Sequence, residues 1–210
     1  MFEVQDWGLI DYQEAWDRQN EIVKDIQANR NRNVLVLCEH PSVITVGKNG
    51  HDNNIIPTTE FLNSLGLQVI YNNRGGDVTL HNPKQLVGYP IFNLSSMKED
   101  LHWFLRKVEE TIIDVIANWN LVGDKVEGLT GVWLEEKRKI CAMGFHCSRW
   151  VTSHGFALNV ANALEEFNYI IPCGITDKEV TSISKETGTE IDMSIVKQIT
   201  IESFKKQFGF

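Results

Sequence analysis

Five short runs rich in β-branched and aromatic residues constrain the fold of this chain most. They are VLVLC (34–38), VITVG (43–47), QVIYN (68–72), DVTLH (77–81) and QLVGYPIFN (85–93). Turn-forming residues separate them, at Glu39-His40-Pro41, at Arg74-Gly75-Gly76 and at Pro83. Short β-rich runs separated by turn-forming residues are typical of strands. Because the last three runs follow one another closely, the pattern predicts three successive strands of an antiparallel sheet.

Further strands are expected in the second half of the chain. GVWLEE (131–136) and KICAMGF (139–145) indicate two strands joined by a charged turn, and WVTSHGFALNV (150–160) indicates another. All three are short and rich in β-forming residues, which is the usual strand signal.

Two helices are predicted in the first third of the chain. Asp11 with Glu14 three residues later has the form of a capping box, and apolar residues then recur at helical spacing as far as Ile26. A shorter helix is expected to begin at Thr58 or Thr59 and to end at Gly66.

Two longer helical patterns follow. Ser96 and Glu99 have the form of a second capping box, and the apolar face behind them runs from Leu101 to Trp119, so this helix is expected to be the longest. A last helix is predicted over about 195–208, before Gly209. The fold class predicted is α+β, a mixed, mostly antiparallel sheet with packed helices. No repeat or linker interrupts the chain, so residues 1–210 are expected to form a single domain.

Composition excludes several classes of protein. A net charge of −8 and a pI near 5.3 argue against general nucleic-acid binding, which needs a basic surface. No apolar tract approaches the roughly 18 residues of a membrane span. The start of the chain lacks a basic segment followed by an apolar one, so a cytoplasmic location is expected.

The cysteines and histidines show no metal-binding or disulfide pattern. Cys38, Cys141, Cys147 and Cys173 include no CxxC pair, and the histidines lack ligand spacing. The cysteines are interpreted as free thiols, and no metal or cofactor is expected.

The segment from Arg74 to His81 is the first candidate for a binding site. Gly75 and Gly76 allow unusual backbone angles and a close approach of the backbone to a ligand. The simpler interpretations remain open: paired glycines form turns, Arg74 could be a surface arginine, and His81 could be a structural histidine.

Cys173 and Lys139 are the candidates for chemistry. Cys173 lies between Pro172 and Gly174, in a segment suited to presenting a thiol at a cleft, whereas the other three cysteines lie in apolar runs. Lys139 lies between a charged turn and a buried strand, where partial desolvation would let it exchange a proton with a thiol. The alternative is that Lys139 belongs to an exposed Lys-Arg-Lys turn. Ser153-His154-Gly155 suggests a hydrolase only weakly, because no G-x-S-x-G motif is present.

Several sequence blocks together resemble the octanoyl-[acyl-carrier-protein]:protein octanoyltransferases of lipoate biosynthesis. The blocks are RGGDVTLH (74–81), QLVGYPI (85–91), GVWL (131–134), KICAMG (139–144), SRWVTSHGFALN (148–159), Pro172-Cys173-Gly174 and Val180-Thr181-Ser182. Their order and separations match the family from about His40 to Ser182. The fold that this resemblance implies is the catalytic domain of the biotin/lipoyl protein ligase superfamily.

The resemblance also implies roles for residues. The acyl-thioester cysteine falls on Cys173, and the lysine that lowers the pKa of this thiol falls on Lys139. The substrate-binding positions implied are Arg74, Gly75, Gly76, Asp77, Val78, Thr79, Leu80, His81, Ala142, Met143, Gly144, Gly155, Phe156 and Ala157. Among these, Val78, Leu80, Met143 and Phe156 are expected to line an acyl tunnel, and N–H groups of Gly75, Gly76 or Gly144 are expected to hold an oxyanion.

The implied reaction moves an octanoyl group from octanoyl-acyl carrier protein to a lysine of lipoyl domains, in 2-oxoacid dehydrogenase complexes and in the glycine-cleavage H protein. This chain departs from the family pattern at Lys48, Asn82 and Lys84, where an arginine and two glycines are usual. Two alternatives stay open. One is an ATP-dependent lipoate or biotin ligase of the same fold, and the other is a module that docks carrier or lipoyl domains without catalysis.

Overall fold

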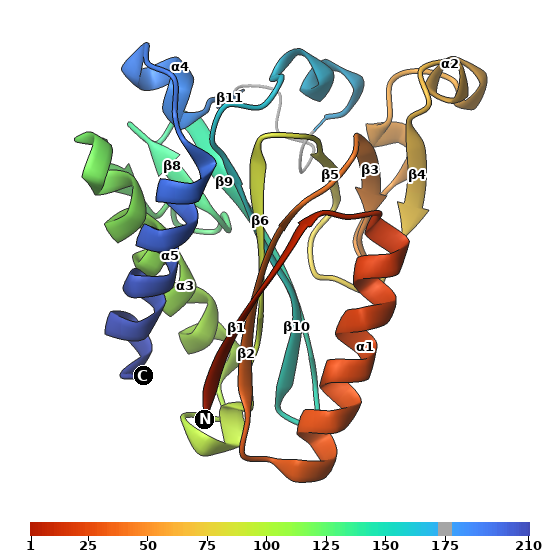
Figure 1. The fold of residues 1–210 in the computed structure, drawn as a ribbon. Coiled ribbons are helices and arrows are strands. Elements are labelled where there is room, and N and C mark those ends of the chain that lie inside the picture. Colours follow the sequence, from red (N-terminus) through yellow and green to blue (C-terminus); the bar gives the residue numbers. More distant parts are fainter. Residues whose placement is uncertain (172–177) are drawn as a thin grey trace.

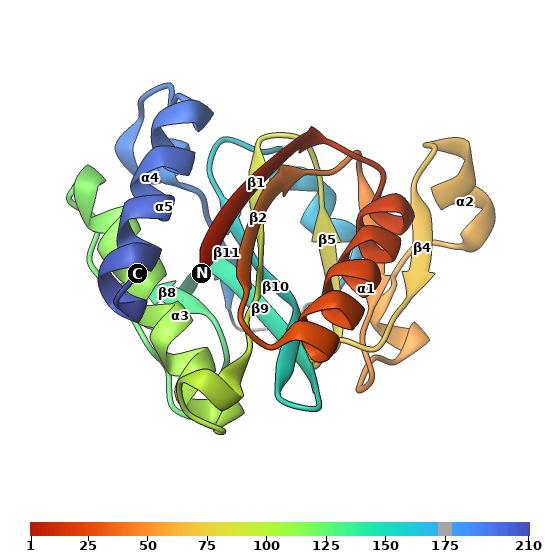
Figure 2. The same ribbon diagram turned by 60° about the horizontal axis from the view of Figure 1, so that its bottom comes forward.

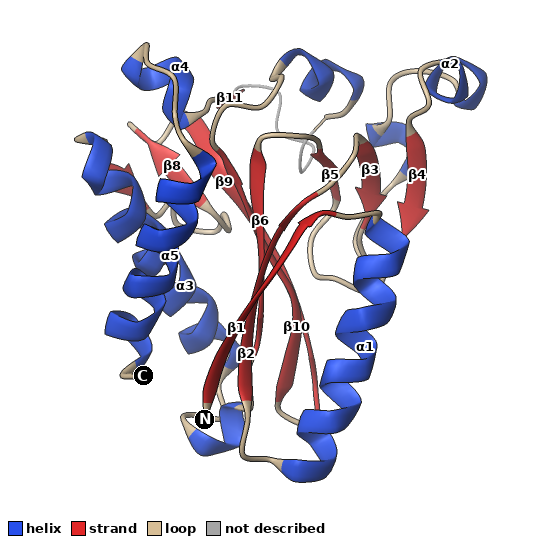
Figure 3. Cartoon of the chain, in the orientation of Figure 1, coloured by secondary structure: helices blue, strands red, loops and turns tan. Residues whose placement is uncertain are grey.

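The computed structural model describes residues 1–171 and 178–210. The strands are β1 (Phe2–Leu9), β2 (Asn33–Glu39), β3 (Val43–Val46), β4 (Gln68–Tyr71), β5 (Val78–His81), β6 (Gln85–Ile91), β7 (Gly123–Asp124), β8 (Val132–Leu134), β9 (Arg138–Ser148), β10 (Val151–Asn159) and β11 (Glu179–Val180). The α-helices are α1 (Tyr12–Asn29), α2 (Thr59–Ser64), α3 (Leu101–Ile116), α4 (Ile183–Thr187) and α5 (Met193–Phe208). Short 3₁₀ turns are η1 (Asp52–Asn54), η2 (Leu94–Ser96), η3 (Ala117–Trp119) and η4 (Glu165–Tyr169). Figure 3 distinguishes the helices from the strands by colour.

The strands form two sheets. The larger has the order β1-β2-β6-β10-β9-β8-β7, with β11 paired to β9, and the smaller has the order β4-β3-β5. Parallel pairing occurs between β1 and β2, between β9 and β11, and between β3 and β4, whereas the other paired strands among the described residues are antiparallel. The predicted α+β class with a mixed, mostly antiparallel sheet is confirmed.

The predicted sheet of three successive strands is wrong, because neither of its two neighbouring pairs forms. The runs at 68–72, 77–81 and 85–93 do form strands β4, β5 and β6, but these strands do not pair with one another in succession. The earlier strand β3 lies between β4 and β5, and β6 enters the larger sheet between β2 and β10. Local turn signals identify strands, whereas the order of strands depends on which faces can be buried together.

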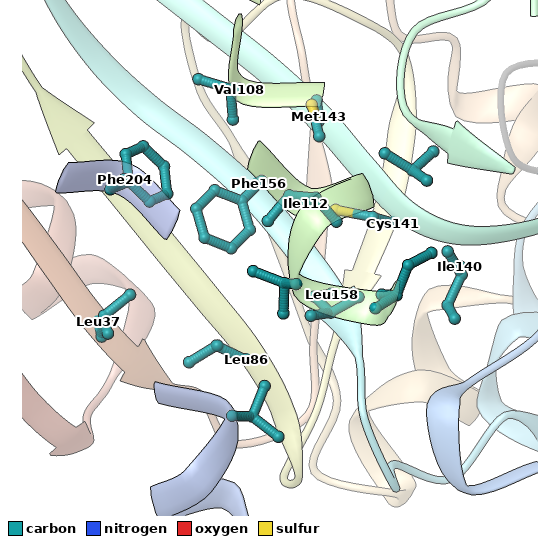
Figure 4. Close-up of a cluster of buried hydrophobic side chains, with 14 of the residues drawn as sticks. Leu37, Leu86, Val108, Ile112, Ile140, Cys141, Met143, Phe156, Leu158 and Phe204 are labelled. Atoms are coloured by element: carbon teal, nitrogen blue, oxygen red, sulfur yellow. The ribbon is translucent and has the colours of Figure 1, made fainter. Parts of the chain in front are cut away.

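The larger sheet buries both of its faces. Alternate residues of β2 divide between two core clusters: Leu35 and Leu37 pack with α3 and α5, while Val34 and Val36 pack with α1. Figure 1 shows α3 and α5 on one side of the sheet and α1 on the other, and Figure 2 shows the same layers after rotation. The cluster beneath α3 and α5 is drawn in Figure 4. A third cluster joins the smaller sheet to α2 and η4.

The helix ends follow the expected capping chemistry with one exception. Asp11 accepts from the N–H of Glu14, Thr58 accepts from the N–H of Phe61, and Gly209 ends α5 with φ 73°. The predicted cap at Ser96 is wrong, because Ser96 ends η2 and the carboxylate of Asp100 caps α3 instead. The prediction that this helix is the longest is also wrong, since α1 has 18 residues and α3 has 16.

The sequence patterns miss β1. This strand contains Glu3, Gln5 and Asp6 and is half-exposed along most of its length, so it lacks an apolar run. Parallel pairing with β2 stabilises it. Because α1 separates the two strands in the sequence, no local pattern indicates this pairing.

Lys84 adopts a backbone conformation that favours glycine. Its φ is 66°, its N–H donates to Glu39 Oε2 at 2.8 Å, and its carbonyl accepts from the N–H of Ala161 at 3.1 Å. These two bonds hold the turn between β5 and β6 in the left-handed region, which costs a residue with a Cβ about 1–2 kcal/mol.

We therefore expect Lys84→Gly to increase the free energy of unfolding by up to about 1 kcal/mol. Relief of strain exceeds the entropy of about 0.5–1 kcal/mol that glycine adds to the unfolded chain. Urea denaturation measures the change, and Lys84→Ala is the control because it removes the charge but keeps the Cβ. A glycine variant less stable than the alanine variant would contradict this interpretation.

Candidate functional site

A cavity lies between the two sheets, lined by β5 from the smaller sheet and by β6, β9 and β10 from the larger. The space open to the centre of a water molecule is about 60 Å³, several times what one buried water requires. The described residues that line it are Tyr12, Arg74, Gly76, Asp77, Val78, Thr79, His81, Gln85, Val87, Tyr89, Thr130, Lys139, Ala142, Met143, Gly144, His154, Gly155, Phe156, Ala157, Asn159, Phe167 and Val180.

Most of the predicted site residues meet at this cavity although they come from separate segments. Small residues face one another across β9 and β10, where Ala142 pairs with Ala157 and Gly144 pairs with Gly155. These positions line the cavity. The short side chains of Ala142 and Ala157 add little bulk to its wall, whereas Gly144 and Gly155 let the backbone carbonyls of Gly75 and Gly88 approach closely. The walls are therefore suited to a narrow, largely apolar ligand.

A β-bulge directs Lys139 towards the cavity. Across β8 and β9, Val132 pairs with Cys141 but Trp133 pairs with Lys139, so Ile140 is an extra residue. Ile140 and Cys141 consequently both pack in the core beneath α3 and α5, although they are consecutive. In a regular strand Lys139 would share the face of Cys141, whereas here it lines the cavity together with Ala142. The alternative of a merely exposed turn lysine is not what the structure shows.

Two predicted site residues do not line the cavity. Leu80 is fully buried in the third core cluster, beside Ile44 and Leu62. The N–H of Gly75 donates to the carbonyl of Phe145 at 3.0 Å, so it is not available to an oxyanion. The predictions of Leu80 as a tunnel residue and of Gly75 as an oxyanion donor are therefore corrected. The side chain of Leu80 is used in core packing, and the N–H of Gly75 is used in its bond to Phe145.

Met143 and Phe156 lie between the cavity and the hydrophobic core. Both contribute to the lining of the cavity, and both belong to the core cluster packed under α3 and α5, as Figure 4 shows. The Phe156 ring fills the space that a side chain at Gly88 would need, since a Cβ there would lie 2.2 Å from the ring.

Arg74 is a buried structural arginine that hydrogen-bonds to the backbone, and it is not a surface arginine. It is 7% exposed, and its Nη2 donates to the carbonyls of Thr45 at 2.6 Å and Asp77 at 2.7 Å. The loop that it braces lies close to β9, because a Cβ on Gly144 would lie 2.4 Å from the carbonyl oxygen of Gly75. These glycines are thus required for backbone to approach backbone.

Asp77 connects the cavity to the chain just before Pro172. Its Oδ2 accepts from Asn54 Nδ2 at 2.5 Å, and the Asn54 carbonyl accepts from the N–H of Ile171 at 2.8 Å. Beyond residue 177, Val180 of β11 pairs with Lys139, whose carbonyl accepts from the N–H of Thr181 at 3.0 Å. The two flanks of segment 172–177 are therefore tied to the cavity walls.

Cys173 lies outside the described residues. Of the other cysteines, Cys38 and Cys141 are buried and Cys147 is partly buried. Burial raises the pKa of all three thiols above the ordinary value, which disfavours the reactive thiolate.

Two buried histidines, His81 and His154, line the cavity, and a third, His40, packs edge-on against His81. Burial lowers the pKa of His40 to about 4 and those of His81 and His154 to about 3. His81 Nδ1 donates to Gln85 Oε1 at 2.8 Å, because the Gln85 amide nitrogen is occupied by Leu80 and Asn159 acceptors. His154 Nε2 bonds to Asn73 Oδ1 at 2.6 Å. That partner is not a serine, so the Ser153-His154 hydrolase interpretation loses its basis.

These histidines predict a loss of stability in acid. In the unfolded chain they bind protons below about pH 6.5, while in the folded chain they stay neutral until pH 3–4. Stability is therefore complete above pH 6.5 and falls as pH drops towards 4, each group contributing a slope of about 1.4 kcal/mol per pH unit. We expect His154→Gln to reduce the slope of unfolding free energy against pH by one such contribution. The control is His102→Gln at an exposed position of α3, and equal slopes in both variants would contradict the argument.

Several cavity residues were not predicted, among them Tyr12, Gln85, Tyr89, Asn159 and Phe167. Tyr89 and Gln85 lie within a predicted strand, but periodicity alone does not indicate which face of a doubly buried strand meets a ligand. Among the described residues, no group of three or more His, Cys, Asp or Glu could hold a metal ion. None of the helices in 1–171 and 178–210 is long and apolar enough to cross a membrane.

Comparison with known proteins agrees with the resemblance seen in the sequence. The octanoyltransferase of Cytophaga hutchinsonii is 44% identical to this chain over 223 residues, covering 98% of this chain and 91% of the relative. The octanoyltransferase of Bacteroides fragilis strain YCH46 is 45% identical over 202 residues, covering 92% of this chain and 91% of the relative.

Solved structures confirm the expected fold. A bipartite lipoate protein ligase from Thermoplasma acidophilum superposes with a TM-score of 0.74 at 13% identity, covering all of this chain and 85% of that chain. The biotin protein ligase of Aquifex aeolicus gives a TM-score of 0.57 at 13% identity, covering 99% and 70%. The sequence model of one protein family, the lipoyl protein ligase A/B catalytic domain, matches residues 11–205. The chain therefore belongs to this family.

Proposed function

We propose that this octanoyltransferase takes its acyl group from octanoyl-acyl carrier protein, holds it as a thioester on Cys173, and passes it to the lysine of lipoyl domains. The observation that carries this proposal is the position of Lys139. The bulge at Ile140 turns Lys139 into a cavity with small and apolar walls, and its strand partner Val180 follows Cys173 by only seven residues.

The first half of the reaction is a thiol–thioester exchange. Lys139 accepts the proton of the Cys173 thiol, and the thiolate attacks the carbonyl carbon of the octanoyl thioester. The bond from that carbon to the carrier sulfur breaks, and the departing thiolate takes the proton back from Lys139. One thioester replaces another, so this step is nearly balanced in energy.

The second half forms an amide. The amine of the acceptor lysine attacks the carbonyl carbon of the Cys173 thioester, and Lys139 takes a proton from that amine. The bond from the carbon to the Cys173 sulfur breaks, and Lys139 returns the proton to this sulfur, so Cys173 leaves as the thiol. The amide is more stable than the thioester, so transfer proceeds forward. Of the N–H groups expected to stabilise the oxyanions, that of Gly76 remains a candidate. Gly75 donates to Phe145, and Gly144 faces Gly155 in a hydrogen-bonded pair of the ladder between β9 and β10.

The cavity walls that Ala142, Ala157 and Val78 contribute are apolar and carry short side chains, which suits the cavity to an unbranched acyl chain. Apolar walls also keep water from the thioester. We propose that residues 1–210 act as one catalytic domain, that the reaction takes place in the cytoplasm, and that the acceptors are the lipoyl domains of 2-oxoacid dehydrogenase complexes and the glycine-cleavage H protein.

An assay with two acyl sources tests the function. Lipoyl domain is incubated with the chain and either octanoyl-acyl carrier protein without ATP or octanoic acid with ATP, and its mass is measured. We expect octanoylation in the first mixture. Product in the second mixture alone would identify an ATP-dependent ligase, and binding without product in either mixture would identify a docking module.

A further inference from the structure

Trp133 lies against the proposed proton partner. It is the cross-strand neighbour of Lys139 at the edge of the bulge, and Lys139 Nζ lies 4.6 Å from the centroid of its ring. The ring is 1% exposed, so it is fixed by its surroundings. Ammonium groups at this distance are attracted to an aromatic face, and tryptophan provides the strongest attraction of the aromatic side chains.

The identity of residue 133 is not explained by hydrogen bonding. The indole Nε1 of Trp133 is buried and has no hydrogen-bond partner among residues 1–171 and 178–210. Buried tryptophans usually find such a partner, and a phenylalanine would avoid the cost of leaving the N–H unpaired. What tryptophan supplies here beyond phenylalanine is its larger and more electron-rich face, and Lys139 is the cation that lies over it.

The segment leading to Trp133 is held in place by a buried carboxylate. Glu109 of α3 is fully buried, accepts from the N–H of Gly131 at 3.0 Å and pairs with Arg106 at 2.6 Å. Gly131 has φ 115°, and a Cβ there would lie 2.4 Å from the carbonyl oxygen of Cys141. The start of β8, and with it the ring of Trp133, is therefore fixed relative to β9.

We propose that Trp133 is a positioning residue, whose ring face holds the ammonium group of Lys139 at the cavity. A lysine has a long flexible stem, and contact of its ammonium with a fixed aromatic face reduces the number of positions that it occupies. The inference rests on the proposed function, because it assigns to Trp133 the placement of the group that stabilises the Cys173 thiolate.

The test is the pH dependence of Cys173 alkylation by iodoacetamide in Trp133→Phe and Trp133→Leu, both in a Cys147→Ala background. We expect the midpoint to move to higher pH by about half a unit in the leucine variant and by less in the phenylalanine variant. Thermal denaturation checks that each variant is folded. If the leucine variant does not fold, the phenylalanine variant carries the test, since it keeps an aromatic core residue.

The same substitutions are then made together with Lys139→Met. If Trp133 acts through Lys139, they no longer move the midpoint. A midpoint unchanged by Trp133→Leu, while Lys139→Met shifts it, overturns this inference and leaves the proposed function standing. A shift that persists in the Lys139→Met background also overturns the inference. If Lys139→Met leaves the pH midpoint of Cys173 alkylation unchanged, the role of Lys139 in the proposed function is contradicted, and the inference about Trp133 is contradicted with it.

Discussion

Replacing Cys173 by alanine abolishes octanoyl transfer in a protein that still folds. Removing a covalent nucleophile leaves only binding and oxyanion stabilisation, so we expect a loss of at least about a thousandfold in turnover. No acyl adduct should form. Turnover is measured as octanoylation of a lipoyl domain, with octanoyl-acyl carrier protein as the donor.

Cys147→Ala is the matched control for this prediction. Cys147 is the least buried of the described cysteines, and burial still raises the pKa of its thiol. Its removal is expected to leave turnover within about twofold, as for substitutions away from the reacting groups. Full activity in Cys173→Ala would remove the mechanism, whatever the control shows.

Lys139→Met is expected to keep the fold and to slow thiolate formation at Cys173. An ammonium group within about 4–6 Å of a thiol stabilises the thiolate and lowers the pKa of the thiol by about one unit or more. The midpoint of Cys173 alkylation should therefore rise by about one to two pH units, and turnover should fall by roughly 10²–10⁴ because proton transfer is lost. Alkylation rate against pH is measured in the Cys147→Ala background, and Cys38 and Cys141 do not interfere because they are buried.

The control for this variant is Lys137→Met. Lys137 is exposed in the turn between β8 and β9, two residues before Lys139, so the substitution changes net charge equally. We expect its alkylation profile to match that of the unmodified chain. Equal shifts in the two variants would mean that general electrostatics, and not the position of Lys139, controls the thiol.

Local signals in the sequence predict a helix or strand well where residues within that element determine its structure. Asp11 and Thr58 cap the helices that they were expected to begin, and the β-rich runs form strands. The cap of α3 was missed because Ser96 and Asp100 both lie before the apolar face, and Ser96 is used by the preceding 3₁₀ turn. Strand β1 was missed because its stability comes from pairing with β2 and not from its own composition.

The candidate site was predictable only through the family resemblance. Periodicity does not reveal that β5, β9 and β10 meet around one cavity, since those contacts join segments far apart in the chain. The orientation of Lys139 depends on the bulge at Ile140, which no spacing rule indicates. The resemblance did not separate Leu80, which packs in a core cluster, from the neighbours Thr79 and His81 that line the cavity.

The central claim is that Cys173 carries the acyl group during transfer. The chain is mixed with octanoyl-acyl carrier protein in the absence of ATP and of acceptor, and its intact mass is recorded, followed by fragmentation to find the modified residue. We predict a gain of one octanoyl group, located on Cys173 and lost on addition of lipoyl domain. A chain that transfers octanoyl at full rate without ever gaining this mass, or that gains it on another residue, would contradict the account.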